Sequence, residues 1–177
     1  MQSVRHLFCW MIIAGFAWMS VGCVSSGLQT DDLYPDATDF QISERAEIED
    51  TEDARDIIHV LYEYREALVS KDFGTLNRLV SEHYYDNAGT THTTADDYGY
   101  DELSSIFEMM AEYADQVQYE VIVQDVVIDG ARAHIDYEFE YAFRYEIADS
   151  ETWDAGVDVN RLEMHREGDQ WRITSGM

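Results

Sequence analysis

Cys23, in the stretch "SVGCVSSG" at residues 20 to 27, is the residue whose chemistry says most about where this protein works. A cysteine can pack as a core thiol, pair in a disulfide or be covalently modified. The only other cysteine in the sequence, Cys9, lies upstream in an apolar run. The fate of Cys23 therefore depends on whether the residues before it are kept.

Residues 1 to 22 have the pattern of a secretory signal peptide. Arg5 and His6 precede the apolar run "LFCWMIIAGFAWM", and small residues follow it. The run is shorter than the roughly 20 residues that a helix needs to cross a bilayer. We therefore predict a cut directly before Cys23. That cut removes Cys9 as well, and leaves Cys23 without a disulfide partner within the chain.

The same segment resembles the box at which bacterial lipoproteins are acylated, because Gly22 directly precedes Cys23. Ser20 departs from the pattern, which usually has Leu at that position. The resemblance implies a lipidated Cys23, a membrane anchor of acyl chains and a place in the cell envelope. Val24 is similar to the sorting context of outer-membrane lipoproteins, facing the periplasm or the cell surface. The alternative is ordinary signal cleavage, which leaves a free cysteine at the new N-terminus.

Other residues that could bind a metal or a cofactor do not have the spacing of a known motif. The histidines that follow the signal form no i, i+4 pair on a helix, although His134 and His165 could face each other across paired strands. The acidic stretches at 96–102 and 149–158 do not have the spacing of a calcium loop, and are interpreted as solvated acids in loops. Phosphate-binding and dinucleotide motifs are missing. We therefore predict neither a metal site nor a cofactor.

The composition narrows the choice of partners. The 177 residues include 37 acidic and 11 basic side chains, which gives a formal net charge of -26, and Lys71 is the only lysine. Binding to nucleic acid relies on Lys and Arg, so a nucleic-acid partner is disfavoured. Anionic lipid headgroups would be repelled as well, and attachment to a membrane should therefore come from acyl chains.

Two segments of different character follow the signal. Residues 23 to 52 contain the only proline and many acids, without strand alternation or a sustained helical stripe. They are predicted to form a lipidated, acidic and disordered tether. Residues 53 to 177 have the length of one ordinary domain, and we expect them to fold without the tether.

The first half of this domain is predicted to contain three helices. Residues 53 to 70 place Ala54, Ile57, Ile58 and Leu61 at helical spacing, after acids that favour a helix start. Shorter amphipathic patterns follow at 72–82 and 100–114.

The second half alternates with period two and predicts antiparallel strands. Runs at 117–129 and 131–147 are joined by a turn at Asp129 and Gly130, and another hairpin turns at Gly168. One face of the second run is apolar and the other is charged, so the sheet has one buried face. The apolar positions are Ala133, Ile135, Tyr137, Phe139, Tyr141, Phe143 and Tyr145.

The order of these elements, with "SKDFGTLNRLVSEHYYDNAGT" and the ending "GDQWRITSG", resembles the nuclear transport factor 2-like superfamily, which includes polyketide-cyclase-like and ketosteroid-isomerase-like proteins. The resemblance covers residues 53 to 177. It implies an α+β fold, in which three N-terminal helices pack on a curved, mostly antiparallel sheet. It also implies a pocket in the open end of the cone, and frequent homodimers formed through the sheet.

The resemblance to ketosteroid isomerase implies a candidate catalytic pair. Tyr62 would donate a hydrogen bond to an enolate oxygen, and Asp86 would take a proton next to a carbonyl. The second acid of such a site would have to come from the long strands, whose carboxylates fall on the wet face. The simpler interpretation is that Tyr62 lies at the rim of the core and that Asp86 forms a turn.

Three classes of function stay open: a binding module for a small apolar ligand or an envelope protein, an isomerase or cyclase, and an interaction scaffold. Because polar groups suited to catalysis are sparse, we favour a non-enzymatic module that combines the first and the third. If a ligand binds, aromatic walls with a few hydroxyls should line its pocket. The expected lining residues are Tyr62, Tyr85, Phe107, Met110, Tyr137, Phe139 and Tyr141.

Overall fold

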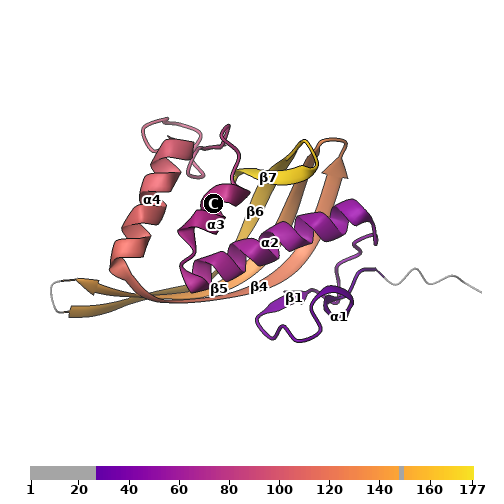
Figure 1. The fold of residues 1–177 in the computed structure, drawn as a ribbon, viewed down its shortest axis with the longest axis horizontal. Coiled ribbons are helices and arrows are strands. Elements are labelled where there is room, and N and C mark those ends of the chain that lie inside the picture. Colours follow the sequence, from indigo (N-terminus) through magenta and orange to yellow (C-terminus); the bar gives the residue numbers. More distant parts are fainter. Residues whose placement is uncertain (1–26, 148–149) are drawn as a thin grey trace, which may run out of the picture.

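Helices cover one face of a long, curved sheet in the computed structural model, which describes residues 27–147 and 150–177 (Figure 1). The helices are α1 (Thr30–Leu33), α2 (Glu52–Ser70), α3 (Phe73–Leu79) and α4 (Tyr100–Tyr113). The strands are β1 (Phe40–Ile42), β2 (Tyr85–Asp86), β3 (Tyr98–Gly99), β4 (Ala114–Asp129), β5 (Arg132–Ile147), β6 (Ser150–Glu167) and β7 (Gln170–Ser175).

Local chemistry explains where the first two main helices begin. The hydroxyl of Thr51 accepts a hydrogen bond from the amide of Ala54 at 3.1 Å, which caps α2. Asp72 caps α3 in the same way through the amide of Thr75, at 3.0 Å. Between the two helices, Lys71 adopts a left-handed conformation with φ of 58°, so the chain turns sharply and α3 packs back near α2.

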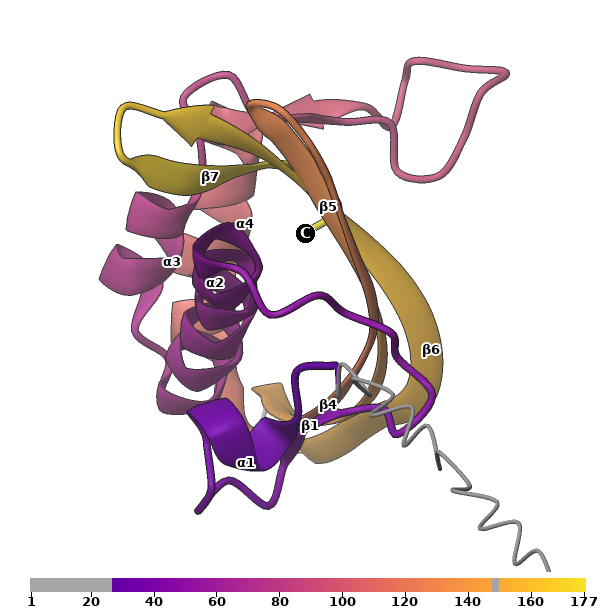
Figure 2. The same cartoon turned by 90° about the vertical axis from the view of Figure 1, so that its right-hand side faces the viewer.

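The main sheet has the strand order β1-β4-β5-β6-β7. Strands β4 to β7 pair in an antiparallel manner, through turns at which Gly130 and Gly168 have positive φ, whereas β1 pairs parallel to β4. The sheet curves around α2, with the helices on its inner side (Figure 2). Register shifts in β4 and in the β6–β7 pairing occur where an extra residue lets a strand bend. The predicted α+β class is confirmed.

Residues 150 to 158 differ from the expectation of an acidic loop, because they form the first half of β6. Phe139 pairs with Asp158 and Tyr141 with Gly156. Aspartate and glycine are poor strand formers by themselves. Here the long aromatic strand β5 supplies the partner, and this tertiary contact overrides the local preference.

The expectation of a tether also fails for residues 27 to 52, which belong to the fold. Leu28, Phe40 and Ile48 are buried in the common core, and β1 adds a strand beside β4. The apolar residues of this segment are widely spaced, and their pairing partners lie about 80 residues away, so no local period revealed them. The predicted signal, the lipidation site at Cys23 and the first tether residues lie outside the described residues.

Replacing Phe40 by Ala tests whether this segment stabilises the domain. Phe40 is 0% exposed, so the substitution should lower the free energy of unfolding by about 3–5 kcal/mol in urea denaturation. Gln41→Ala, at an exposed neighbouring position, serves as the matched control and should change stability little. Equal stability of the two variants would restore the tether interpretation.

Candidate functional site

An aromatic row lines the inner face of β5, as the alternation predicted. Tyr137 is buried, and Phe139, Tyr141 and Phe143 are half-buried. Successive ring centroids lie 5.6 to 5.8 Å apart, within the range of favourable aromatic pairs. Tyr141 lies across Gly156 of β6, where a Cβ atom would approach the ring to 3.2 Å. The row is therefore packed along β5 and over β6.

Tyr137 also belongs to a group of three buried tyrosines, with Tyr64 of α2 and Tyr119 of β4. The rings of Tyr64 and Tyr119 pack edge to face with centroids 6.1 Å apart, and the rings of Tyr119 and Tyr137 both neighbour that of Phe139. The pKa of each phenol is raised, first of all by burial away from water. The hydroxyl of Tyr137 accepts a hydrogen bond from the side chain of Asn160 at 3.1 Å. The cluster is thus a group of neutral phenols inside the core.

Asp86 is 9% exposed, and hydrogen-bond donors of the chain engage both of its carboxylate oxygens. Oδ2 accepts from the amide of Gly176 at 2.6 Å and from the hydroxyl of Ser175 at 3.2 Å. Oδ1 accepts from the amide of Ala88 at 2.8 Å. Asp86 therefore fastens the short strand β2 to the end of β7.

Residues 176 and 177 fill the space next to Asp86. The carbonyl of Gly176 accepts a hydrogen bond from Asn160 at 2.7 Å, and the amide of Met177 donates to the hydroxyl of Tyr84 at 2.9 Å. The hydroxyl of Tyr98 donates to the carbonyl of Met177. Only glycine fits at position 176, because φ is 96° and a Cβ would lie 2.0 Å from a backbone oxygen.

The two residues of the predicted catalytic pair have different surroundings. The ring of Tyr62 stacks on that of Tyr34, with centroids 3.9 Å apart, and meets the edge of Phe40. This is the side of α2 that faces α1 and β1. Among the described residues, no ring that packs on Tyr62 belongs to a residue that hydrogen-bonds to Asp86.

The other predicted lining residues are divided between the core and the surface. Phe107 is buried against Phe73 of α3, with centroids 6.2 Å apart, and Met110 packs at the edge of the core. Tyr85 is 56% exposed, and its hydroxyl donates to Asp97. The structure thus gathers the predicted residues of β5 and α4 on the inner side of the fold, and places Tyr85 outside it.

Two hollows lined by described residues lie beside α2. One of about 380 Å³ lies between α2, α3 and the turn before β7, and its lining includes His59, Arg78 and Arg172. Another of about 470 Å³ lies between Tyr34, Pro35 and the side of α2.

Sequence reasoning missed Tyr64, Asn160 and Gly176 as members of the polar inner site. Tyr64 and Tyr62 are two positions apart on a helix, so they point to nearly opposite sides, and the buried stripe of α2 was the available signal for choosing Tyr64. Asn160 and Gly176 gave no signal, because their role arises from the pairing of β6 with β7.

The described part of the chain contains no group of three or more potential metal ligands. His134 pairs with Glu163 and His165 with Arg132, so the two histidines are not directly opposite each other. No helix within the described ranges is both long and apolar enough to cross a membrane.

Comparison with known proteins identifies the fold. No protein-family model matches the sequence. A search of curated proteins also finds no match. Among solved structures, a conserved protein from Planctomyces limnophilus is 16% identical, with a TM-score of 0.57, over 70% of this chain and 92% of that one. A ketosteroid isomerase-like protein from Erwinia carotovora atroseptica is 14% identical, with a TM-score of 0.56, over 72% and 95%.

A candidate dehydratase of the nuclear transport factor 2-like family from Streptomyces avermitilis is 17% identical, with a TM-score of 0.54, over 70% of this chain and 93% of that one. The fold is nuclear transport factor 2-like. At these identities, the likeness concerns the fold and leaves activity to be argued from the residues of this chain.

The buried tyrosines predict instability at alkaline pH. Their folded-state pKa values lie above the unfolded value near 10, so above about pH 10 the unfolded chain releases protons that the folded chain retains. The free energy of unfolding should therefore be unaffected below that pH and should fall as the pH rises further.

Absorbance at 295 nm and far-UV circular dichroism, recorded together, check this expectation. Part of the phenolate signal should appear only as the secondary structure is lost. Tyr119→Phe should reduce the part of the phenolate absorbance that appears with unfolding. The free energy of unfolding of this variant should also fall less steeply with pH. Complete ionisation with a native dichroism spectrum would contradict the expectation.

Proposed function

We propose that this chain is a non-enzymatic interaction module with the nuclear transport factor 2-like fold, carried by a lipoprotein of the cell envelope. The observation that supports it best is the way in which the chain itself surrounds Asp86. Asp86 is engaged by Ala88, Ser175 and Gly176, and residues 176 and 177 occupy the adjoining space. A carboxylate held this way is poorly placed to take a proton from a bound substrate.

The fold neighbours include proteins described as dehydratase and isomerase-like, so an enzyme is the natural competitor. Such chemistry needs an acid–base pair around one substrate position. In this chain, Tyr62 stacks beside Tyr34 while Asp86 binds the end of β7. The neutral hydroxyls of Tyr64, Tyr119 and Tyr137 are buried in the core, and that of Tyr137 accepts a hydrogen bond from Asn160, which suits them to a structural role.

Binding of a small apolar ligand is a second candidate function, favoured by one observation. Phe139 and Tyr141 are only half-buried on the inner face, and Met110 lies at the edge of the core. Native mass spectrometry of protein purified from its own host, together with a dye for apolar cavities, distinguishes the candidates. A co-purified ligand whose retention is lost in Tyr141→Leu would favour ligand binding over the interaction module.

Replacing Asp86 tests the structural role that the proposal gives it. Asp86→Asn removes the negative charge and replaces one acceptor oxygen by an NH2 group, so either Ala88 or the pair Ser175 and Gly176 loses its acceptor, and the free energy of unfolding should fall by about 1–3 kcal/mol. Urea denaturation measures the change, and Glu82→Gln, the same change of acid to amide at an exposed position nearby, is the control. If Asp86→Asn instead keeps full stability and abolishes turnover of a ketosteroid or dehydratase substrate, the enzyme takes first place.

The envelope part of the proposal rests on the sequence around Cys23. The full-length protein should fractionate with membranes and incorporate labelled fatty acid, and Cys23→Ala should abolish both. Ser25→Ala, two residues further on, is a matched control and should behave as wild type. Recovery of membrane-bound, unlabelled Cys23→Ala protein would contradict lipidation.

A further inference from the structure

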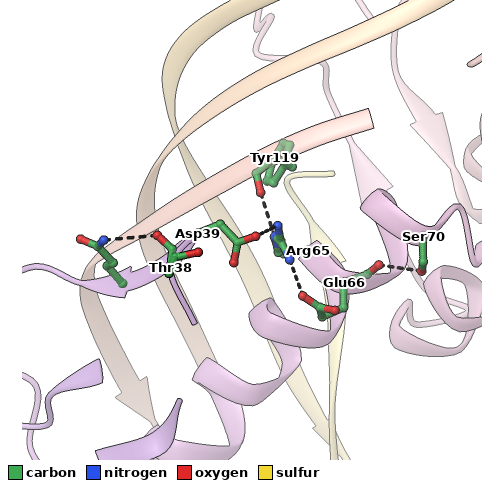
Figure 3. Close-up of polar contacts among 7 residues, drawn as sticks. Thr38, Asp39, Arg65, Glu66, Ser70 and Tyr119 are labelled. Atoms are coloured by element: carbon green, nitrogen blue, oxygen red, sulfur yellow. Dashed lines mark hydrogen bonds and ion pairs between the residues drawn. The ribbon is translucent and has the colours of Figure 1, made fainter. Parts of the chain in front are cut away.

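The main sheet has two edges that differ in how their backbone groups are paired. At the β4 edge, other parts of the chain cover these groups. Strand β1 pairs with residues 121–123 of β4. Beside this contact, the guanidinium of Arg65 donates to the carbonyl of Tyr119 at 2.8 Å (Figure 3). Lys71 donates to the carbonyls of Ala114 and Asp115, both at 3.2 Å. The only lysine of the chain thus helps to close the β4 edge.

The opposite edge, formed by the first half of β6, has no such cover among the described residues. Strand β7 pairs with β6 only from Glu163 to Glu167. The preceding residues of β6 pair with β5 alone, where the two strands extend past α4 (Figure 1). The amide of Val159 donates to the side chain of Asp158, and that of Arg161 to Asn160, both at 2.8 Å. At Val159 the side chain of Asp158 thus already binds the amide, so a partner strand must displace it there or pair with the residues before it.

Along this edge, apolar side chains on the outer face alternate with acidic side chains on the inner face. Trp153, Val157 and Val159 are 50%, 62% and 71% exposed on the outer face, opposite to the aromatic row. Asp154 and Asp158 are exposed on the inner face. Long exposed edges tend to pair with further strands, and natural proteins protect them with charged side chains, proline, bulges or a covering segment.

We propose that residues 151 to 159 of β6 bind an extended segment of a partner protein, which adds a strand to the sheet. The segment would alternate apolar residues, which cover Trp153 and Val157, with basic residues opposite Asp154 and Asp158. In this binding mode, main-chain hydrogen bonds provide affinity and alternate side chains provide specificity. The inference rests on the proposed function, because it names the partner class of an interaction module.

Charge favours a basic partner segment over a second copy of this chain. A second copy carries the same net charge of -26 and the same acids on its own β6. The nearest outer-face neighbours of Val157 and Val159 on β5 are Glu140 and Glu138, which add to the negative potential. A segment with lysine or arginine at alternate positions is attracted by this field.

A labelled peptide of about nine residues that alternates Val and Lys, the length of an ordinary strand, is a direct probe. The full-length protein in detergent should bind it, as measured by fluorescence anisotropy, and should bind the peptide with Glu in place of Lys at least about tenfold more weakly. A peptide of the same composition with the Val and Lys residues in separate blocks should also bind more weakly. Hydrogen exchange should slow at residues 153–159 when the alternating peptide is bound.

Variants of the protein locate the binding site. Val157→Lys should weaken binding of the alternating peptide by about tenfold or more, because a charge replaces the apolar contact and repels the peptide. Val127→Lys is the matched control, at an exposed valine of β4 away from this edge, and should leave binding unchanged. The double variant Asp154→Asn/Asp158→Asn keeps the strand and should reduce both the affinity and its dependence on salt.

Three results would overturn the inference: no binding of the alternating peptide, binding that Val157→Lys leaves intact, or protection located away from β6. A dimer in sedimentation that Val157→Lys dissociates would also overturn it, by making a second copy the occupant. None of these results depends on the stability or turnover of the Asp86 variant. The proposed non-enzymatic function can therefore stand or fall separately.

Discussion

Much of the packing of α2 against β1 and β4 depends on the hydrogen bonds of the buried Arg65 guanidinium (Figure 3). It donates to Asp39 just before β1, to Glu66 on its own helix and to the carbonyl of Tyr119 in β4. Burying a cation is costly unless it is paired and hydrogen-bonded, and here two carboxylates and a carbonyl compensate it. One side chain of α2 thereby fixes both the N-terminal segment and the edge of the sheet, so removing it would leave two acids and a backbone group without their donor.

The sequence predicted the elements whose signals are local. The stripe of α2, the alternation of β5 and the turns at Gly130 and Gly168 all depend on neighbours within a few positions. The N-terminal segment and the first half of β6 were missed because their stability comes from partners far along the chain. In the candidate site, the aromatic row followed from alternation, whereas the choice between Tyr62 and Tyr64 depended on which side of one helix faces the sheet. The contacts of Asp86 with residues 175 and 176 had no precursor in any sequence pattern.

Several of the few arginines in this acidic chain form ion pairs between different strands and helices. Arg161 forms a two-point ion pair with Asp136 across β5 and β6, at 2.6 and 2.7 Å, and this partner lowers the pKa of Asp136. Arg144 joins β5 to Asp115 of β4, and Arg166 joins β6 to Asp53 of α2. With these arginines engaged internally, the remaining surface is left predominantly anionic. Partners of this fold should therefore be selected by sign of charge as well as by shape.

The burial of Leu28 so soon after Cys23 has a geometric consequence. Leu28 is five positions after Cys23, and even a fully extended chain spans at most about 3.3–3.6 Å per residue, so the reach is roughly 17 Å. A lipid on Cys23 would hold the fold in a shallow layer along the bilayer, with limited freedom to tilt. Within such a layer the encounter with a partner becomes nearly two-dimensional. The effective concentration of a partner on the same membrane would then be set by the density of molecules along the membrane rather than by the volume of the compartment.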